Sequence, residues 1–151
     1  MKLNLFINYY IDNNPKRMRE LKTCVKENIC NPEIDEIIVL IANKDFPSLT
    51  DLLDEINTKD IHKVTTVTFD TRPTYNDYFF LTRSCLNAIN IIANKDMIMD
   101  AESLKRLKDW DWENHCLALS RWDFKDGNIR KEEAIHFNRA DSQDVWMLKG
   151  G

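Results

Sequence analysis

Glycine and proline are scarce in this 151-residue chain, which contains three glycines and four prolines. Disordered and fibrous chains are usually rich in one or both, so neither class fits. Long apolar runs are also missing, since no stretch approaches the roughly 20 residues of a membrane-spanning helix. The amino-terminal segment is interrupted by Asn4 and Asn8, and no small-residue cleavage site follows it. It therefore predicts a core strand rather than a signal peptide.

An excess of positive charge is absent as well. The formal net charge is −4 and the sequence pI is about 5.4. This balance argues against a nucleic-acid partner, and leaves open a local basic site or a site made basic by a bound cation.

Several motifs of common enzyme classes are missing from the chain. It contains no G-x-G-x-x-G, Walker-type, G-x-S-x-G or H-E-x-x-H segment. These absences remove the usual dinucleotide-binding, NTPase, hydrolase and zinc-protease classes.

The four cysteines form no C-x-x-C pair and have no histidine at metal-ligand spacing. Cys24 and Cys85 fall on the apolar stripes of predicted helices, which indicates reduced, buried thiols. Such thiols are typical of a cytoplasmic protein, and this location is our expectation. The sequence does not decide whether two of the cysteines form a disulfide.

The chain does contain a regular alternation of strand-like and helix-like segments, long enough for one domain. The predicted strands are residues 3–10, 36–42, 64–69, 89–93, 116–120 and 145–148; the predicted helices start at Pro15, Ser48, Tyr75 and Ala101 and end near Asn31, Ile56, Ala88 and Trp110. This order predicts the α/β class, with a mostly parallel central sheet and helices on both faces. Residues 123–141 are polar and aperiodic, and predict a long surface loop.

The third predicted helix has an apolar stripe that should face the core. Its members would be Tyr78, Phe79, Thr82, Leu86 and Ile89.

The most informative segment follows the apolar strand 89–93, where Asn94 and Asp96 stand two residues apart. Side chains two apart on an extended chain point to the same side, so both can reach one ligand. At the carboxyl end of a buried strand, Asp96 could bind a divalent cation and Asn94 a sugar hydroxyl or the ligand itself. The simpler alternative is a polar turn that leaves the strand. Asp100, just before a helix, fits an N-cap better than a second metal ligand.

Polar residues also follow or precede two later strands. Arg121 could pair with a phosphate and Trp122 could offer a flat wall to a sugar or base, or the two could form an ordinary half-buried surface pair. Asp141 and Asp144 precede the last strand, where either carboxylate could act as a general base. The alternative is a polar loop in which Asp141 or Ser142 satisfies local backbone groups.

Two more segments end early strands. Arg72 precedes a helix start whose free N–H groups could bind an anion, although Thr74 to Asp77 also resembles a structural capping arrangement. Asn8, Tyr9 and Tyr10 close the first strand, where a flat tyrosine ring could stack on a base.

The order of these segments resembles glycosyltransferase-like domains of the GT-A fold, of the small bacterial and viral type. The resemblance rests on N-Y-Y, R-P-T-Y-N-D-Y-F, I-I-A-N-K-D-M-I-M-D, L-A-L-S-R-W-D and D-S-Q-D-V-W-M-L-K-G, which together span most of the chain. It implies a nucleotide-sugar that lies across the carboxyl ends of a parallel sheet.

The resemblance also implies roles for single residues. Asn94 and Asp96 would take the two positions of the GT-A Asp-x-Asp motif, with Asp96 as ligand of Mn²⁺ or Mg²⁺. Asn8, Tyr9, Arg72 and Arg121 would face the donor, which would be a UDP- or GDP-type sugar. Asp144 or Asp141 would activate the acceptor, a glycan or another hydroxyl compound. The asparagine at position 94 departs from the family motif and lowers the carboxylate count.

The resemblance predicts a single GT-A-like domain that acts as a metal-dependent glycosyltransferase. The chain stops at Gly151, where such domains usually continue, so a minimal enzyme, the first part of a longer protein and a domain that binds without turnover all stay open. The alternatives in function are a non-catalytic nucleotide or nucleotide-sugar binding module and a metal-dependent phosphoester hydrolase.

Overall fold

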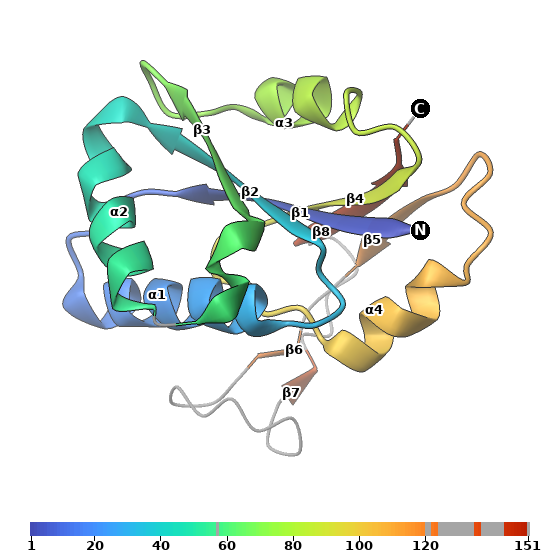
Figure 1. The fold of residues 1–151 in the computed structure, drawn as a ribbon, viewed down its shortest axis with the longest axis horizontal. Helices are drawn as coiled ribbons and strands as arrows, with labels where there is room; N and C mark the ends of the chain where they lie inside the picture. Colours follow the sequence, from blue (N-terminus) through green and yellow to red (C-terminus); the bar gives the residue numbers. More distant parts are fainter. Residues whose placement is uncertain (57, 120–121, 124–134, 137–143, 151) are drawn as a thin grey trace.

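The computed structural model describes residues 1–56, 58–119, 122–123, 135–136 and 144–150. Six strands form one sheet, and helices lie on both of its faces (Figure 1). The elements are β1 (Lys2–Tyr9), α1 (Pro15–Cys30), β2 (Glu36–Ala42), η1 (Asn43–Asp45), α2 (Phe46–Glu55), η2 (Lys59–Lys63), β3 (Val64–Phe69), α3 (Tyr75–Thr82), β4 (Ala88–Ala93), α4 (Ala101–Lys108), β5 (Cys116–Leu119), β6 (Trp122–Asp123), β7 (Ile135–His136) and β8 (Val145–Lys149). The prediction of an α/β fold is therefore confirmed.

The strand order in the sheet is β3-β2-β1-β4-β8-β5. The four strands β3, β2, β1 and β4 are parallel, whereas β8 runs antiparallel to both of its neighbours. The chain order reverses between β1 and β4, because β2 and β3 lie on one side of β1 and β4 on the other. Such a switch point opens a crevice at the carboxyl ends of the strands, where ligands of α/β folds bind.

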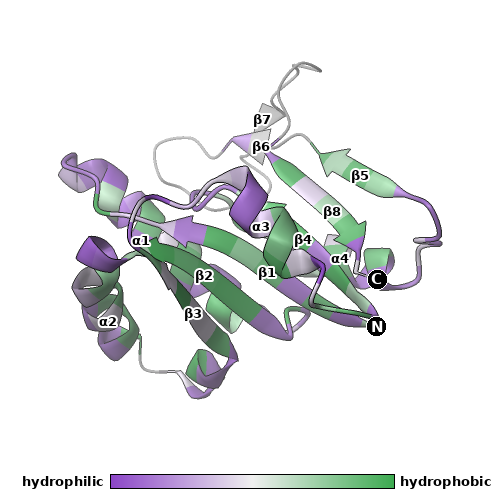
Figure 2. Ribbon diagram, turned by 90° about the horizontal axis from the view of Figure 1, so that it is seen from above, coloured by the Kyte–Doolittle hydropathy of each residue, from purple (hydrophilic) through white to green (hydrophobic). Residues whose placement is uncertain are grey.

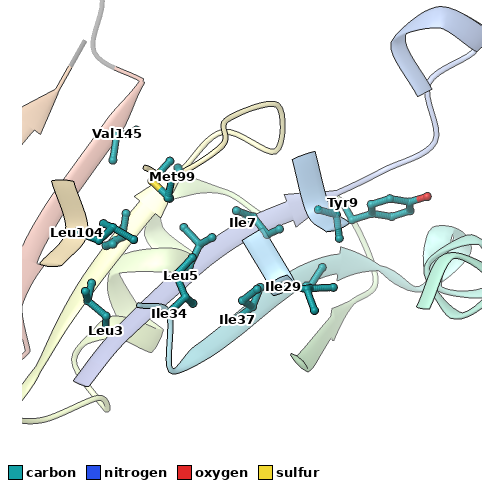
Figure 3. Close-up of a cluster of buried hydrophobic side chains, with 14 of the residues drawn as sticks. Leu3, Leu5, Ile7, Tyr9, Ile29, Ile34, Ile37, Met99, Leu104 and Val145 are labelled. Carbon is teal, nitrogen blue, oxygen red and sulfur yellow. The ribbon is translucent and has the colours of Figure 1, made fainter. Parts of the chain in front are cut away.

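The central strands are apolar along most of their length because both of their faces are covered (Figure 2). On one face, Leu5 and Ile7 pack with Ile29 of α1 and Leu104 of α4 (Figure 3). Ile91 and residues of α2 belong to the same cluster. On the other face, Phe6 and Leu40 pack with α3. Alternate residues of β1 thus enter different cores, which fixes the register of the strand.

The third helix is shorter than predicted, since α3 ends at Thr82 and not near Ala88. The buried amide of Asn90 donates hydrogen bonds to the carbonyls of Thr82 and Cys85, and so takes up acceptors at the end of the helix. Asn87 adopts a positive φ of 56°, which turns the chain into β4.

The predicted core stripe of this helix needs the same correction. Tyr78 and Thr82 are buried, and so is Ile89, which belongs to β4. Phe79 and Leu86, in contrast, are exposed. Helical spacing of apolar residues predicts which side chains are buried only as far as the helix extends.

The polar stretch predicted as a loop contains a short strand pair. Trp122 pairs with His136 and Asp123 with Ile135 in a two-stranded antiparallel ladder. All the remaining positions of this stretch lie outside the described residues.

Two predictions from composition can be compared with the described part of the chain. None of its helices is long and apolar enough to cross a membrane. All four cysteines are free thiols, with Cys24 buried and Cys85 half-buried. Burial raises the pKa of the Cys24 thiol to about 11.

Candidate functional site

A pocket of about 400 Å³ lies at the carboxyl edge of the sheet, at the switch point between β1 and β4. Residues from the ends of both strands meet there with the first turn of α1 and the start of α3. The lining residues are Asn8, Tyr10, Arg17, Arg72, Pro73, Thr74, Tyr75, Tyr78, Ile92, Ala93, Asn94, Lys95, Asp96 and Trp146.

The end of β1 sends alternate side chains to opposite faces of the sheet. Asn8 and Tyr10 line the pocket. Tyr9 instead lies in the core with Ile7 and Ile37 (Figure 3), and its hydroxyl is 3.0 Å from that of Ser48. The predicted ligand contact of Tyr9 is thus corrected: the strand period of two turns Tyr9 inward and gives the pocket Tyr10.

The segment after β4 is held in place by α1. Asn28 donates a 2.7 Å hydrogen bond to the carbonyl of Met97 and accepts one of 2.9 Å from the N–H of Met99. Asn31 donates to the carbonyl of Met99 at 2.8 Å. Since two buried amides satisfy three backbone groups, the loop that carries Asn94 to Asp96 has a defined position.

Asp96 is engaged in an ion pair. Its carboxylate accepts a hydrogen bond from the guanidinium of Arg17, which also contacts Glu20 at 3.1 Å. The residue predicted to bind a metal is therefore neutralised by a cation of α1.

Lys95 is buried although it carries a charge, with only 4% of its surface exposed. Its Nζ has no hydrogen-bond partner and lies over the ring of Tyr10. Burial, with a contribution from the nearby arginines, lowers the pKa of Lys95 to about 8, and Asp12 offsets part of this effect. A buried ammonium held mainly by an aromatic face is an unusual arrangement, because such groups normally have a charged or hydrogen-bonding partner.

Arg72 reaches the same tyrosine from the loop before α3. Its guanidinium carbon is 4.6 Å from the centroid of the Tyr10 ring. The helix start behind it is capped, since the N–H and hydroxyl of Thr74 both donate to Asp77, at 2.6 and 2.8 Å. The capping alternative from the sequence is therefore confirmed, and these bonds hold the pKa of Asp77 below its usual value.

One wall of the pocket is aromatic. Tyr75 at the start of α3 and Trp146 of β8 pack edge to face, with 5.5 Å between their ring centroids. Tyr75 is 53% exposed, so its ring has a free surface that could contact a ligand.

Asp144 lies beside the pocket, at the same edge of the sheet. Because β8 runs antiparallel to β4, the residue before β8 meets the residue after β4. The side-chain amide of Asn94 lies 3.4 Å from a carboxylate oxygen of Asp144, and the two backbones are also bonded. Two residues that are 50 positions apart in the sequence are thus neighbours.

The structure brings most of the predicted site residues together. Asn8, Arg72, Asn94 and Asp96 line one pocket, and Asp144 adjoins it. Asp100 accepts from the N–H of Ser103 at 3.0 Å, which confirms its role as an N-cap. Arg121 and Asp141 lie outside the described residues.

Three pocket residues were missed at the level of sequence, namely Arg17, Lys95 and Trp146. Tyr9 and Tyr10 were both considered, and the period of two in β1 could have favoured Tyr10, given that Asn8 was selected. Lys95 sits between two selected residues, but its burial has no signal in the sequence. Arg17 and Trp146 enter only through the packing of α1 and the pairing of β8.

The charges of the pocket bear on whether it fits a divalent cation. Among the described lining residues are three cations, Arg17, Arg72 and Lys95, against the single carboxylate of Asp96. In the described part of the chain, no group of three or more His, Cys, Asp and Glu side chains is placed to hold a metal ion. A hard cation prefers several oxygen ligands, so this donor set fits a metal poorly and an anion well.

The chain is similar to known proteins in its structure, and no similarity in sequence was found. No family model matches the sequence, and neither does any curated protein. The mannosyltransferase PcManGT from Pyrobaculum calidifontis, in complex with GDP-Man and Mn²⁺, is similar with a TM-score of 0.54 and 13% identity. The match covers 80% of this chain and 36% of the mannosyltransferase, so the chain spans about a third of that protein's length.

A second similar structure is 4-diphosphocytidyl-2C-methyl-D-erythritol synthase from Anaerococcus prevotii. The TM-score is 0.53 at 14% identity, and the match covers 98% of this chain and 70% of the synthase. At such low identity the similarity concerns the fold. The chain therefore has a GT-A-like fold, similar to the folds of this mannosyltransferase and this synthase.

Proposed function

We propose that this domain binds a nucleoside-diphosphate sugar in the switch-point pocket and transfers the sugar to a hydroxyl acceptor. The observation that carries the proposal is the pocket itself, in which three cations and an aromatic wall meet at the carboxyl edge of a GT-A-like sheet. Cations suit a diphosphate, and flat rings suit a base or a sugar.

Transfer of the sugar to a hydroxyl group requires a base near the acceptor. We assign this role to Asp144 or Asp141, of which Asp144 adjoins the pocket through Asn94. The carboxylate would take the proton of the acceptor hydroxyl, whose oxygen bonds to the anomeric carbon. The bond between that carbon and the diphosphate oxygen breaks, and its electron pair leaves with the nucleoside diphosphate. Positive side chains near this oxygen would stabilise the departing charge.

The predicted roles of Asn8, Asn94 and Arg121 as donor contacts belong to this proposal. The predicted Mn²⁺ or Mg²⁺ at Asp96 stays a prediction, and the bound Mn²⁺ of the similar mannosyltransferase is its main support. If bound, the ion would act as a Lewis acid on the leaving diphosphate. Asp96 would have to exchange Arg17 for the ion.

A non-catalytic binding module is the second candidate. It is favoured by the ion pair between Asp96 and Arg17, because this pair engages the one carboxylate among the described residues that line the pocket. A module of this kind would bind the donor in the same pocket and leave catalysis to other residues.

One experiment separates these functions. We would incubate the protein with a panel of UDP- and GDP-sugars, with and without Mn²⁺, and measure free nucleoside diphosphate and sugar. A transferase should show slow donor hydrolysis, and Asp144→Asn should reduce it by about a hundredfold or more. Binding by calorimetry without any turnover would favour the module. Release of phosphate from nucleotides that carry no sugar would favour the phosphoester hydrolase.

A further inference from the structure

Lys95 is the buried one among the three cations that line the pocket. Its ammonium is buried at the wall of the pocket and has no hydrogen-bond partner. Burial of an unpaired charge destabilises a folded protein, so a ligand that supplies the missing partner would bind with a large gain. Such a ligand must be an anion.

Arg72 is placed to bind the same anion. The Nζ of Lys95 and the guanidinium of Arg72 both lie against the ring of Tyr10, and Arg72 is exposed at the pocket rim. Arg72 forms no ion pair with any residue that the structure describes. Two cations held on one ring repel each other, and an anion with several oxygens can contact both at once.

The carboxylate that would oppose such an anion is already neutralised. Asp96 is paired with Arg17, and Arg17 contacts Glu20 as well. Lys95 and Arg72 therefore supply the positive charge that faces the pocket. A divalent cation at this point would compete with Arg17 for one carboxylate and would be repelled by two further cations.

We propose, on the basis of the proposed function, that Lys95 and Arg72 bind the diphosphate of the donor directly and take the place of a divalent cation. In this arrangement the two side chains would stabilise the diphosphate as it leaves, and nucleotide binding would need no metal. Asp96 serves to hold Arg17 and the loop, and the asparagine at position 94 is consistent with a site that does not collect carboxylates.

The test is calorimetry with inorganic pyrophosphate, UDP and GDP in the presence of EDTA. We expect binding without metal, and Lys95→Met and Arg72→Gln should each raise Kd by at least about tenfold. Asp96→Asn should tighten binding by about two- to threefold, because it removes a negative charge from the pocket. Lys105→Met, an exposed lysine of α4, is the matched control and should bind as the wild type does.

The outcomes distinguish this inference from the proposed function. Binding that is lost in EDTA and restored by Mn²⁺, or that is abolished by Asp96→Asn but kept in Lys95→Met, would overturn the inference and leave the transferase intact. Metal-free binding that depends on Lys95, with no turnover of any donor, would support the inference and contradict the proposed transferase activity. Should none of the three probes bind, with or without Mn²⁺, both are wrong. Thermal melting of each variant ensures that a lost signal does not reflect unfolding.

Discussion

Arg17 in the first turn of α1 forms an ion pair with Asp96 at the carboxyl end of β4, across 79 positions of the sequence. The pair joins a helix to the loop that borders the pocket. It also decides the charge of the site, because it engages the one carboxylate among the described residues that line the pocket.

The strength of this ion pair can be measured with a double-mutant cycle of Arg17→Met and Asp96→Asn. Both side chains are partly exposed, at 39% and 28%, so solvent screens the attraction. We expect a coupling of about 1 kcal/mol or less in the free energy of unfolding. Denaturant unfolding of the four proteins gives this value. A coupling several times larger would mean that water is excluded from the pair.

Asn28 should be a stabilising residue of the site loop. In Asn28→Ala, the carbonyl of Met97 and the N–H of Met99 lose their partner, and we expect a loss of roughly 2–4 kcal/mol in unfolding free energy. The exposed Asn76 of α3 provides the control, since Asn76→Ala should change stability by no more than about 0.5 kcal/mol. Equal effects of the two substitutions would contradict the assigned role.

Lys95→Met should make the protein more stable while it weakens anion binding. The methionine has a similar length and removes an unpaired buried charge, which we expect to raise the unfolding free energy by about 1–3 kcal/mol. Thermal melting without ligand measures the effect. A lower melting temperature would indicate that the ammonium has a partner in solution.

Gly150 lies where a side chain cannot be added. An ideal Cβ at this position would be only 1.9 Å from the carbonyl oxygen of Cys85, next to the buried Asn90. Gly150→Ala should therefore cost about 1–3 kcal/mol, because the backbone has to move. Lys149→Ala, at the exposed neighbouring position, should have a much smaller effect in the same unfolding experiment.

The cysteines should react with iodoacetamide in a definite order. Cys30 and Cys116 are exposed and should be alkylated first in the native protein at pH 8. Cys24 is buried and its pKa is raised to about 11, so less than about 1% of it is thiolate at this pH. Mass spectrometry of timed samples tests the order. Rapid labelling of Cys24 would show that α1 opens locally.

The alternation of elements was readable from the sequence because apolar periodicity is a local property. β2 and β3 were predicted with the bounds that the structure has, since their β-branched and apolar runs end in polar turns. The end of α3 was not predicted correctly, because it depends on Asn90, a buried side chain of the next strand. A hydrogen bond from another element does not change the apolar periodicity of the helix itself, so the local sequence pattern does not show it.

The site was predicted in part for the same reason. Asn8, Arg72, Asn94 and Asp96 were found because each follows or ends a strand, and parallel strands bring their carboxyl ends to one edge. The choice of Tyr9 over Tyr10 was not decided by the residue types, since both are tyrosines. Only the direction of each side chain in the sheet separates them.

The sequence by itself thus determined the class of fold and the strand ends that border the pocket, because these follow from local periodicity and chain order. Only the tertiary structure decided the charge of the pocket. Whether Asp96 is open to a metal depends on Arg17, and whether Lys95 has a partner depends on its burial against Tyr10. Charge and desolvation are set by neighbours that are distant in the sequence, so they appear only once the chain is folded.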